Sequence, residues 1–197
     1  MFSSLRTFFR TLLFEALPAI YPLVREIPLR TFLRILLFQA GPQDLPDSRF
    51  LLQLCWVLYF FAGLLVSLPN LSPLAALGAS LLDTGLLSML IWTSLRVRGY
   101  GHRIAQTLTA ALGSLCLLTL LALLLDGWYF LLDETFDSGS GMLPTLIVIG
   151  LVLWSLAVLG HVLRQALSVA LPAAAGLSLA YLALSYQLTS TFFGPLA

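Results

Sequence analysis

The sequence predicts an all-α integral membrane protein with five transmembrane helices preceded by amphipathic interfacial helices. Of its 197 residues, 59% are hydrophobic and only 10% are charged, whereas soluble domains carry about 25% charged residues. After residue 49 the chain consists of long apolar runs separated by short polar turns. Before residue 41, apolar residues recur at helical spacing with arginines between them.

Residues 1–40 are expected to lie in the membrane interface rather than to cross it, because three prolines interrupt them. Such helices insert apolar side chains among lipid tails and reach anionic phosphates with arginines. They can also pack on the protein's own spans, and both arrangements can hold together. The acid-free first 14 residues also fit a mitochondrial presequence, as a minor alternative. The arginines expected to contact lipid or a partner are Arg6, Arg10, Arg30, Arg34, Arg96, Arg98 and Arg103.

Residues 41–49 are predicted to form a hinge between the interfacial helices and the first span. Its helix-breaking and acidic residues are Gly41, Pro42, Asp44, Pro46 and Asp47. Asp47 or Ser48 is expected to cap the following helix. The carboxylates of Asp44 and Asp47 are expected to pair with arginines. The candidate partners are Arg49, Arg96, Arg98 and Arg103, and such pairs would place residues 41–49 against residues 96–103.

The bundle is predicted to occupy residues 50–197, with spans near 50–68, 74–95, 104–125, 143–163 and 169–191. Each is long enough to cross a hydrocarbon core of about 30 Å. Residues 126–141 are expected to form an acidic loop with aromatic residues at the interface. The fold-back between the last two spans is expected within residues 161–172, around Arg164 and Gln165. Gly176 and Ala180 form a small-xxx-small pair that predicts close helix contact.

The arginines predict the orientation of the chain in the membrane. With the N-terminus inside, all ten arginines and four acidic residues fall on the inner side, and four acidic residues fall outside. This segregation follows the positive-inside rule. It predicts a cytoplasmic N-terminus and a periplasmic C-terminus in a bacterial inner membrane, with anionic headgroups as the partner of the cytoplasmic side.

Asp83 is the acidic residue predicted to lie near the middle of a span. A carboxylate there must face the bundle and find hydrogen-bond donors. Some residues at its depth are expected to hydrogen-bond this carboxylate. The polar layer expected there consists of Asp83, Tyr59, Ser114, Trp154, Ser155 and Tyr181. One interpretation is a structural clamp between helices, which we favour because a transport path usually needs several ionisable groups. The other is a relay for a proton or a cation.

The remaining residues that could carry chemistry favour no catalytic or metal site. Cys55 and Cys116 fall inside spans and are expected to be buried and free. His102 and His161 could ligate a b-type haem, but both fall near the surface. No phosphate-binding loop, zinc-protease motif or serine elbow is present. We therefore expect no enzyme, no cofactor, no metal and no nucleic-acid partner.

The segment Gly-Pro-Gln-Asp-Leu-Pro at 41–46 resembles a segment of small uncharacterised proteobacterial inner-membrane proteins. The order of interfacial helices and five spans is similar to that of the Yip1-type membrane family. These resemblances imply a bacterial inner-membrane protein with a trafficking or assembly role. The function expected from the sequence is a non-enzymatic accessory, scaffold or assembly subunit that binds other membrane protein subunits. The alternative is a small transporter or channel component that uses Asp83.

Overall fold

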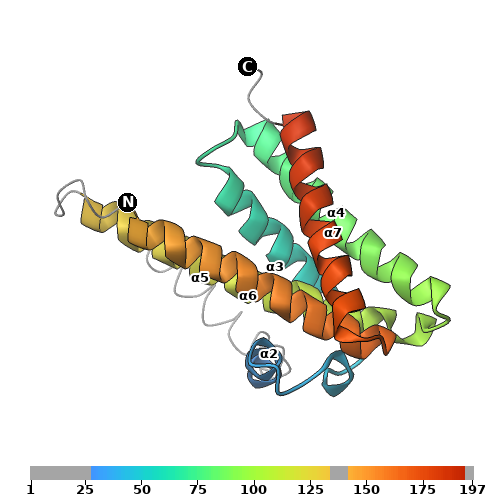
Figure 1. Cartoon of the computed structure of the whole chain (residues 1–197). Coiled ribbons are helices and arrows are strands. Elements are labelled where there is room, and N and C mark those ends of the chain that lie inside the picture. Colours follow the sequence, from blue (N-terminus) through green and yellow to red (C-terminus); the bar gives the residue numbers. More distant parts are fainter. Residues whose placement is uncertain (1–27, 134–141, 194–197) are drawn as a thin grey trace, which may run out of the picture. The chain divides into compact units, whose positions relative to one another are not determined.

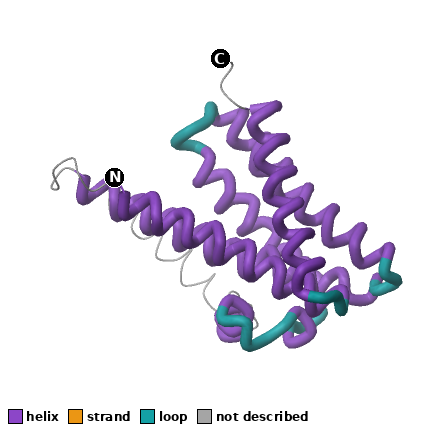
Figure 2. Tube along the Cα trace, in the orientation of Figure 1, coloured by secondary structure: helices purple, strands orange, loops and turns teal. Residues whose placement is uncertain are grey.

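A computed structural model of the chain describes residues 28–133 and 142–193. These residues are helical apart from short connections, and no β-strand occurs among them (Figures 1 and 2). Five helices, α3 to α7, are long and apolar enough to span a membrane, which confirms the predicted number. The elements are α2 (Leu29–Leu36), η1 (Pro42–Asp44), α3 (Arg49–Ser67), α4 (Pro73–Val97), η2 (Gly101–Arg103), α5 (Ile104–Asp133), α6 (Met142–Leu167) and α7 (Leu171–Phe193).

The chain divides into two units, residues 1–30 and residues 31–197, and the five long helices belong to the second. The amphipathic helix predicted near the N-terminus, with Arg6 and Arg10, lies outside the described residues. The second predicted amphipathic helix is α2, whose Phe32 and Ile35 are buried while Leu33 and Arg34 are exposed. Within residues 31–36, this helix therefore packs on the protein and also presents apolar and basic side chains outward.

Two predicted boundaries are wrong. Helix α5 continues to Asp133, so residues 126–133 are helical rather than part of a loop. Helix α6 continues to Leu167, so Arg164 and Gln165 belong to a helix rather than to the fold-back. Both errors came from treating a polar residue as a helix end. A helix ends where the backbone is interrupted, and no proline occurs between residues 104 and 133.

The ends of α2, α4 and α6 share one geometry. Each is followed by a residue with a left-handed backbone: Phe38 (φ 60°), Gly99 (φ 77°) and Ser168 (φ 52°). After Ser168, the Val169 N–H donates to the Arg164 carbonyl over 3.3 Å, which is the hydrogen bond of a Schellman motif. The fold-back at 168–170 lies within the predicted range 161–172. Only the glycine is a recognised sequence signal for this ending, so the predicted centre at Arg164 and Gln165 was a few residues too early.

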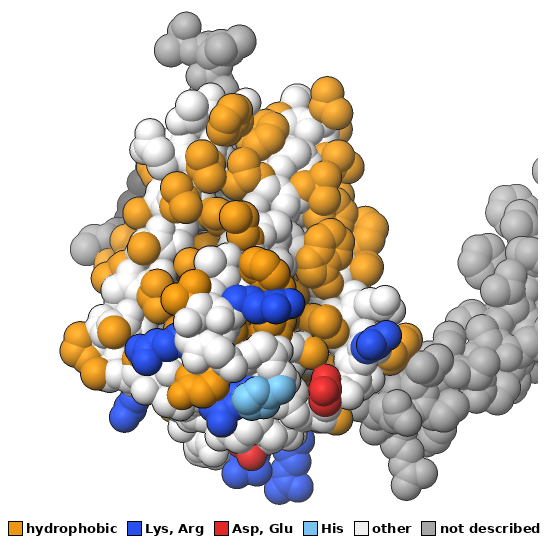
Figure 3. Space-filling view, turned by 90° about the vertical axis from the view of Figure 1, so that its right-hand side faces the viewer, with side chains coloured by type: hydrophobic (Ala, Val, Ile, Leu, Met, Phe, Trp, Pro, Cys, Tyr) orange, Lys and Arg blue, Asp and Glu red, His pale blue; other side chains and the backbone are white. Residues whose placement is uncertain are grey.

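The three connections 37–48, 98–103 and 168–170 join helix ends on the same side of the bundle. All the described arginines from Arg34 onward lie in or beside these connections, and Figure 3 shows arginine side chains gathered below an apolar surface. Helices α5 and α6 form an antiparallel pair, with α3 packed on α5 and α7 packed on α6. Helix α4 packs on α3 and α7. The α5–α6 pair diverges from α3, α4 and α7 toward the ends away from α2 (Figure 1).

Small residues bring α6 and α7 together, but they are not the predicted pair. Gly176 and Ala180 are both exposed, and a Cβ atom added at Gly176 would have no neighbouring atom within 4 Å. The contact instead uses Ala174 and Ser178, which are buried and also four residues apart. A Cβ atom at Gly160 of α6 would lie 3.5 Å from the Ser178 Oγ and 3.8 Å from the Ala175 Cα. The predicted motif type is therefore present two residues earlier, on the opposite face of α7.

Replacing Gly160 with leucine is expected to lower the free energy of unfolding by about 2 kcal/mol, because the side chain would push against the α7 backbone. The matched control is Gly176→Leu, at a position that faces away from the protein. Thermal unfolding of the purified chain in one detergent measures both. Equal effects of the two substitutions would contradict the assigned contact.

Candidate functional site

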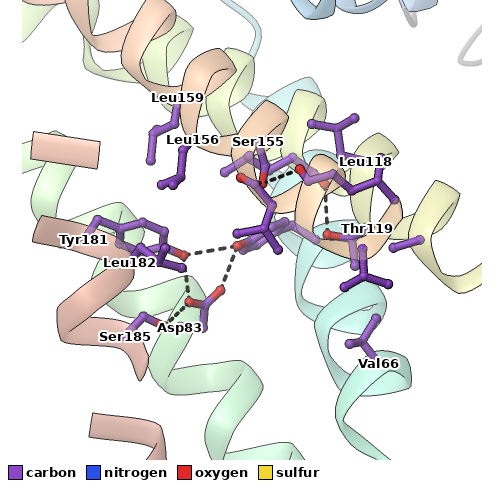
Figure 4. A pocket seen from close by; sticks show the side chains of 16 residues that line it. Val66, Asp83, Leu118, Thr119, Ser155, Leu156, Leu159, Tyr181, Leu182 and Ser185 are labelled. Atoms are coloured by element: carbon purple, nitrogen blue, oxygen red, sulfur yellow. Dashed lines mark hydrogen bonds between the residues drawn. The ribbon is translucent and has the colours of Figure 1, made fainter. Parts of the chain in front are cut away.

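Asp83 lies near the middle of α4, and its carboxylate accepts three hydrogen bonds (Figure 4). The Tyr59 hydroxyl donates to Oδ2 over 2.7 Å, and the Tyr181 hydroxyl donates to Oδ1 over 2.7 Å. The Ser185 hydroxyl donates to Oδ1 over 2.5 Å. Because water is scarce at this depth, these donors replace the solvent that a carboxylate needs.

The donors reach Asp83 from two other helices. Tyr59 comes from α3, while Tyr181 and Ser185 stand one turn apart on the same face of α7. Both tyrosines are buried, with 8% and 7% of their surface exposed, and their hydroxyls lie 3.2 Å apart. The carboxylate therefore ties α3, α4 and α7 together through hydroxyl groups alone.

A cavity of about 320 Å³ adjoins this carboxylate, and all five long helices contribute to its wall. Among the described residues, Asp83 is the only charged one on the wall, and most of the others are apolar. The cavity extends from Asp83 toward Val66 near the end of α3 and Val148 in the first turns of α6. The lining residues are Tyr59, Val66, Asp83, Leu115, Leu118, Thr119, Ala122, Val148, Leu151, Val152, Ser155, Leu156, Leu159, Tyr181, Leu182 and Ser185.

The structure brings together only part of the predicted polar layer. Tyr59 and Tyr181 contact Asp83. Ser155 lines the cavity, but its hydroxyl donates to backbone carbonyls of α6. Trp154 does not belong to the layer, because it is 42% exposed and its ring centroid lies 5.5 Å from that of Phe38.

Ser114 does not bond to Asp83, whereas Ser185, which was not predicted, does. The Ser114 hydroxyl is buried and has no hydrogen-bond partner among the described residues. Depth along a span was the only criterion used for Ser114, and depth does not say which way a side chain points. Ser185 could have been found from the four-residue spacing that places it on the face of Tyr181.

The hinge is held by hydrogen bonds from uncharged side chains. The Gln106 amide donates to the Leu45 carbonyl over 3.1 Å. The Gln165 amide lies 2.9 Å from both the Gln43 amide and a ring nitrogen of His161. The same ring nitrogen lies 3.0 Å from the Ala40 carbonyl oxygen. Residues 40–45 are thus fastened to the start of α5 and the end of α6.

The predicted ion pairs of the hinge are wrong. Asp44 is turned back along its own segment and accepts a hydrogen bond from the Gly41 N–H over 2.8 Å. Neither Asp44 nor Asp47 forms an ion pair with any described arginine. Of the two proposed caps for α3, Ser48 is the residue used, because its hydroxyl accepts from the Leu51 N–H. Pro42 and Gln43 of the hinge and Arg103 of the 96–103 segment border a second cavity together.

The end of the bundle that holds the connections 37–48, 98–103 and 168–170 is called the arginine end below. Both histidines lie there, as the sequence predicts, but they contact different parts of the chain. His102 lies edge-on to Tyr100, whereas His161 contacts the Phe38 ring and the hinge. No cluster of three potential metal ligands occurs in residues 28–133 and 142–193.

Replacing Asp83 with leucine should lower the free energy of unfolding by about 2 kcal/mol, because the Tyr59 and Tyr181 hydroxyls would lose their acceptor. Asp83→Asn should cost less than about 1 kcal/mol, because an amide still accepts and donates at the same place. Thermal unfolding in detergent compares the two variants. A leucine variant as stable as the asparagine variant would show that the hydrogen bonds do not tie the helices.

No protein-family model, curated protein or solved structure matches this chain. The resemblance of residues 41–46 and the similarity of layout to the Yip1-type family therefore remain predictions. The residues and their geometry are the basis for proposing a function.

Proposed function

We propose that the chain is a membrane transport or binding component whose cavity takes a small amphiphilic cation or a proton at Asp83. The observation that carries this proposal is the position of the carboxylate. Among the described residues, it is the only charged group on the wall of a cavity formed by all five long helices. An ionisable residue that faces a cavity inside a membrane is typically functional.

The wall favours a positively charged ligand. None of the described arginines contributes to it, so an ionised Asp83 has no basic partner there. A ligand ammonium group would gain strongly from this carboxylate, because electrostatic attraction is large in a medium of low dielectric constant. Leu118 and Leu156 offer apolar contacts for the rest of the ligand. A volume of about 320 Å³ is at the small end of the range of ligand sites, about 300–1,000 Å³.

The bundle is closed between the cavity and the arginine end. Leu95, Leu112 and Leu163 are fully buried in this part of the core. The lining of the cavity extends away from the arginine end, toward Val66 near the end of α3 and Val148 in the first turns of α6. This arrangement suits binding from the outer side, and transport would require these leucines to separate.

An accessory or assembly subunit is the second candidate. It is favoured by the hydrogen bonds to Asp83, since three donors from the chain itself satisfy the carboxylate without any ligand. Under this proposal the carboxylate is a clamp, and exposed helix faces bind other membrane subunits. Extraction in a mild detergent separates the candidates, because a stable lone monomer counts heavily against an accessory subunit.

We further propose a bacterial inner-membrane location with the arginine end in the cytoplasm. The arginines of the described helices lie at the ends that would face anionic headgroups on the cytoplasmic side. With five spans, the N-terminus is then cytoplasmic and the C-terminus periplasmic.

Ligand binding can be tested with a fluorescent alkylamine and its uncharged N-acetyl analogue, using the chain in phosphatidylcholine nanodiscs. The amine should bind to the native chain, and Asp83→Asn should weaken binding at least about tenfold, because hydrogen bonds and contacts to charged groups are worth about 1.5–3 kcal/mol. Leu156→Trp should also weaken binding by filling the cavity. The control Asp44→Asn changes a carboxylate outside the cavity and should have no effect. Equal binding of the amine and its analogue would contradict the proposal.

Orientation can be tested with a membrane-impermeant maleimide on whole cells. The native Cys55 and Cys116 are buried and free, as the sequence predicts, so the background should be low. Asn70→Cys, in the turn between α3 and α4, should be labelled from outside. Arg98→Cys, in the turn after α4, should be labelled only after the cells are opened. The reverse pattern would invert the topology.

A further inference from the structure

A second cavity, of about 280 Å³, lies at the arginine end of the bundle, away from Asp83. Its wall combines one arginine with several uncharged polar side chains, and no carboxylate from the described part of the chain contributes to it. It is bordered by η1, the end of η2, the first turn of α5 and the last turn of α6. The lining residues are Pro42, Gln43, Arg103, Gln106, Thr107, Gln165 and Ala166.

Most of this wall is fixed in place by hydrogen bonds. Gln106 is held by the Leu45 carbonyl, and Gln43 and Gln165 are held by each other. The Thr107 hydroxyl donates to the Arg103 carbonyl over 2.8 Å, within the first turn of α5. A site whose polar groups are positioned in advance loses little entropy when a ligand binds.

Arg103 supplies the charge of this cavity. Its guanidinium lies 5.0 Å from the centroid of the Tyr100 ring, which supports it from one side. Arg103 forms no ion pair with any described carboxylate. The Asp44 carboxylate, on the neighbouring hinge, accepts a hydrogen bond from the Gly41 N–H. A planar guanidinium with five N–H donors matches a phosphate group closely.

We propose that this cavity binds a phosphate group, presented either by the headgroup of an anionic phospholipid or by a soluble phosphate ester. Arg103 pairs with the phosphate, and the amide groups of Gln43 and Gln106 lie where they can bond to the rest of the headgroup or ester. The cavity stands at the level where α3 and α5 begin, which is the headgroup level of a bilayer crossed by these helices.

Membrane orientation alone explains why an arginine lies here, but it does not explain the cavity. A topology signal needs only positive charge in a loop. It does not require three glutamine side chains at the same wall, fastened to the hinge on one side and to α6 on the other. The proposal therefore separates Arg103 from arginines that lie at the same end without bordering the cavity, such as Arg98.

The test is a titration of the whole chain in detergent with phosphatidylglycerol or phosphatidylcholine, followed by native mass spectrometry. The first phosphatidylglycerol should bind more tightly than phosphatidylcholine, and Arg103→Gln should weaken it about tenfold. Arg98→Gln, which removes the same charge outside the cavity, should change it less than about twofold. Gln43→Ala should weaken it about threefold. Because Gln43 is exposed, this variant tests the proposal even if Arg103→Gln fails to fold.

Competition with glycerol 3-phosphate distinguishes the two sources of phosphate. If this ester displaces phosphatidylglycerol, and Arg103→Gln abolishes the displacement, the cavity takes a soluble phosphate ester. If it does not compete while the Arg103 effect persists, the cavity takes a lipid headgroup. Equal losses in Arg103→Gln and Arg98→Gln, or no loss in either Arg103→Gln or Gln43→Ala, would overturn the proposal. None of these measurements depends on a ligand at Asp83.

Discussion

The rest of the bundle depends on one constraint, which is that Asp83 must be hydrogen-bonded within an apolar interior. A carboxylate without donors at this depth would cost several kcal/mol, about the whole stability of a small domain. The chain meets this requirement with Tyr59 from α3 and with Tyr181 and Ser185 from α7. The three helices are therefore fixed relative to one another at that level, and the sliding or rotation of one would break a hydrogen bond.

The position of the cavity follows from where the small residues lie. Toward the arginine end, Gly160 lets α6 approach Ala174 of α7, and Gly113 lies against the Phe32 ring of α2. Closer to the other end, the facing residues are branched, such as Val148 and Leu182. Helices pack closely where side chains are small, and these contacts hold α6 against α7, and α5 against α2, at the arginine end.

The sequence predicted the features that depend on composition, but not those that depend on the direction in which a side chain points from its helix. The five spans follow from long apolar runs, and the arginines gather at one end because their positions alternate with those runs. Tyr59 and Tyr181 were identified because depth narrows the choice of partners for a carboxylate. Which residues at this depth would reach Asp83 could not be predicted, and Ser114 does not. The rotation of a helix about its axis is set by packing with distant residues. The turn at Ser168 lies within the predicted range, but its exact place was not predicted, because serine rarely adopts a left-handed backbone.

Because the predicted ion pairs of the hinge do not form, the Arg103 guanidinium remains available to bind an anion in the second cavity. An ion pair at a water interface contributes little to stability, because both charges are well hydrated before they meet. Amide groups of glutamine hold the hinge at a lower desolvation cost, and they do so from two helices at once. Asp44 accepts a hydrogen bond from the Gly41 N–H and forms no ion pair with Arg103. Had Asp44 paired with Arg103, the cavity would have lost its positive charge and its means of selecting an anion.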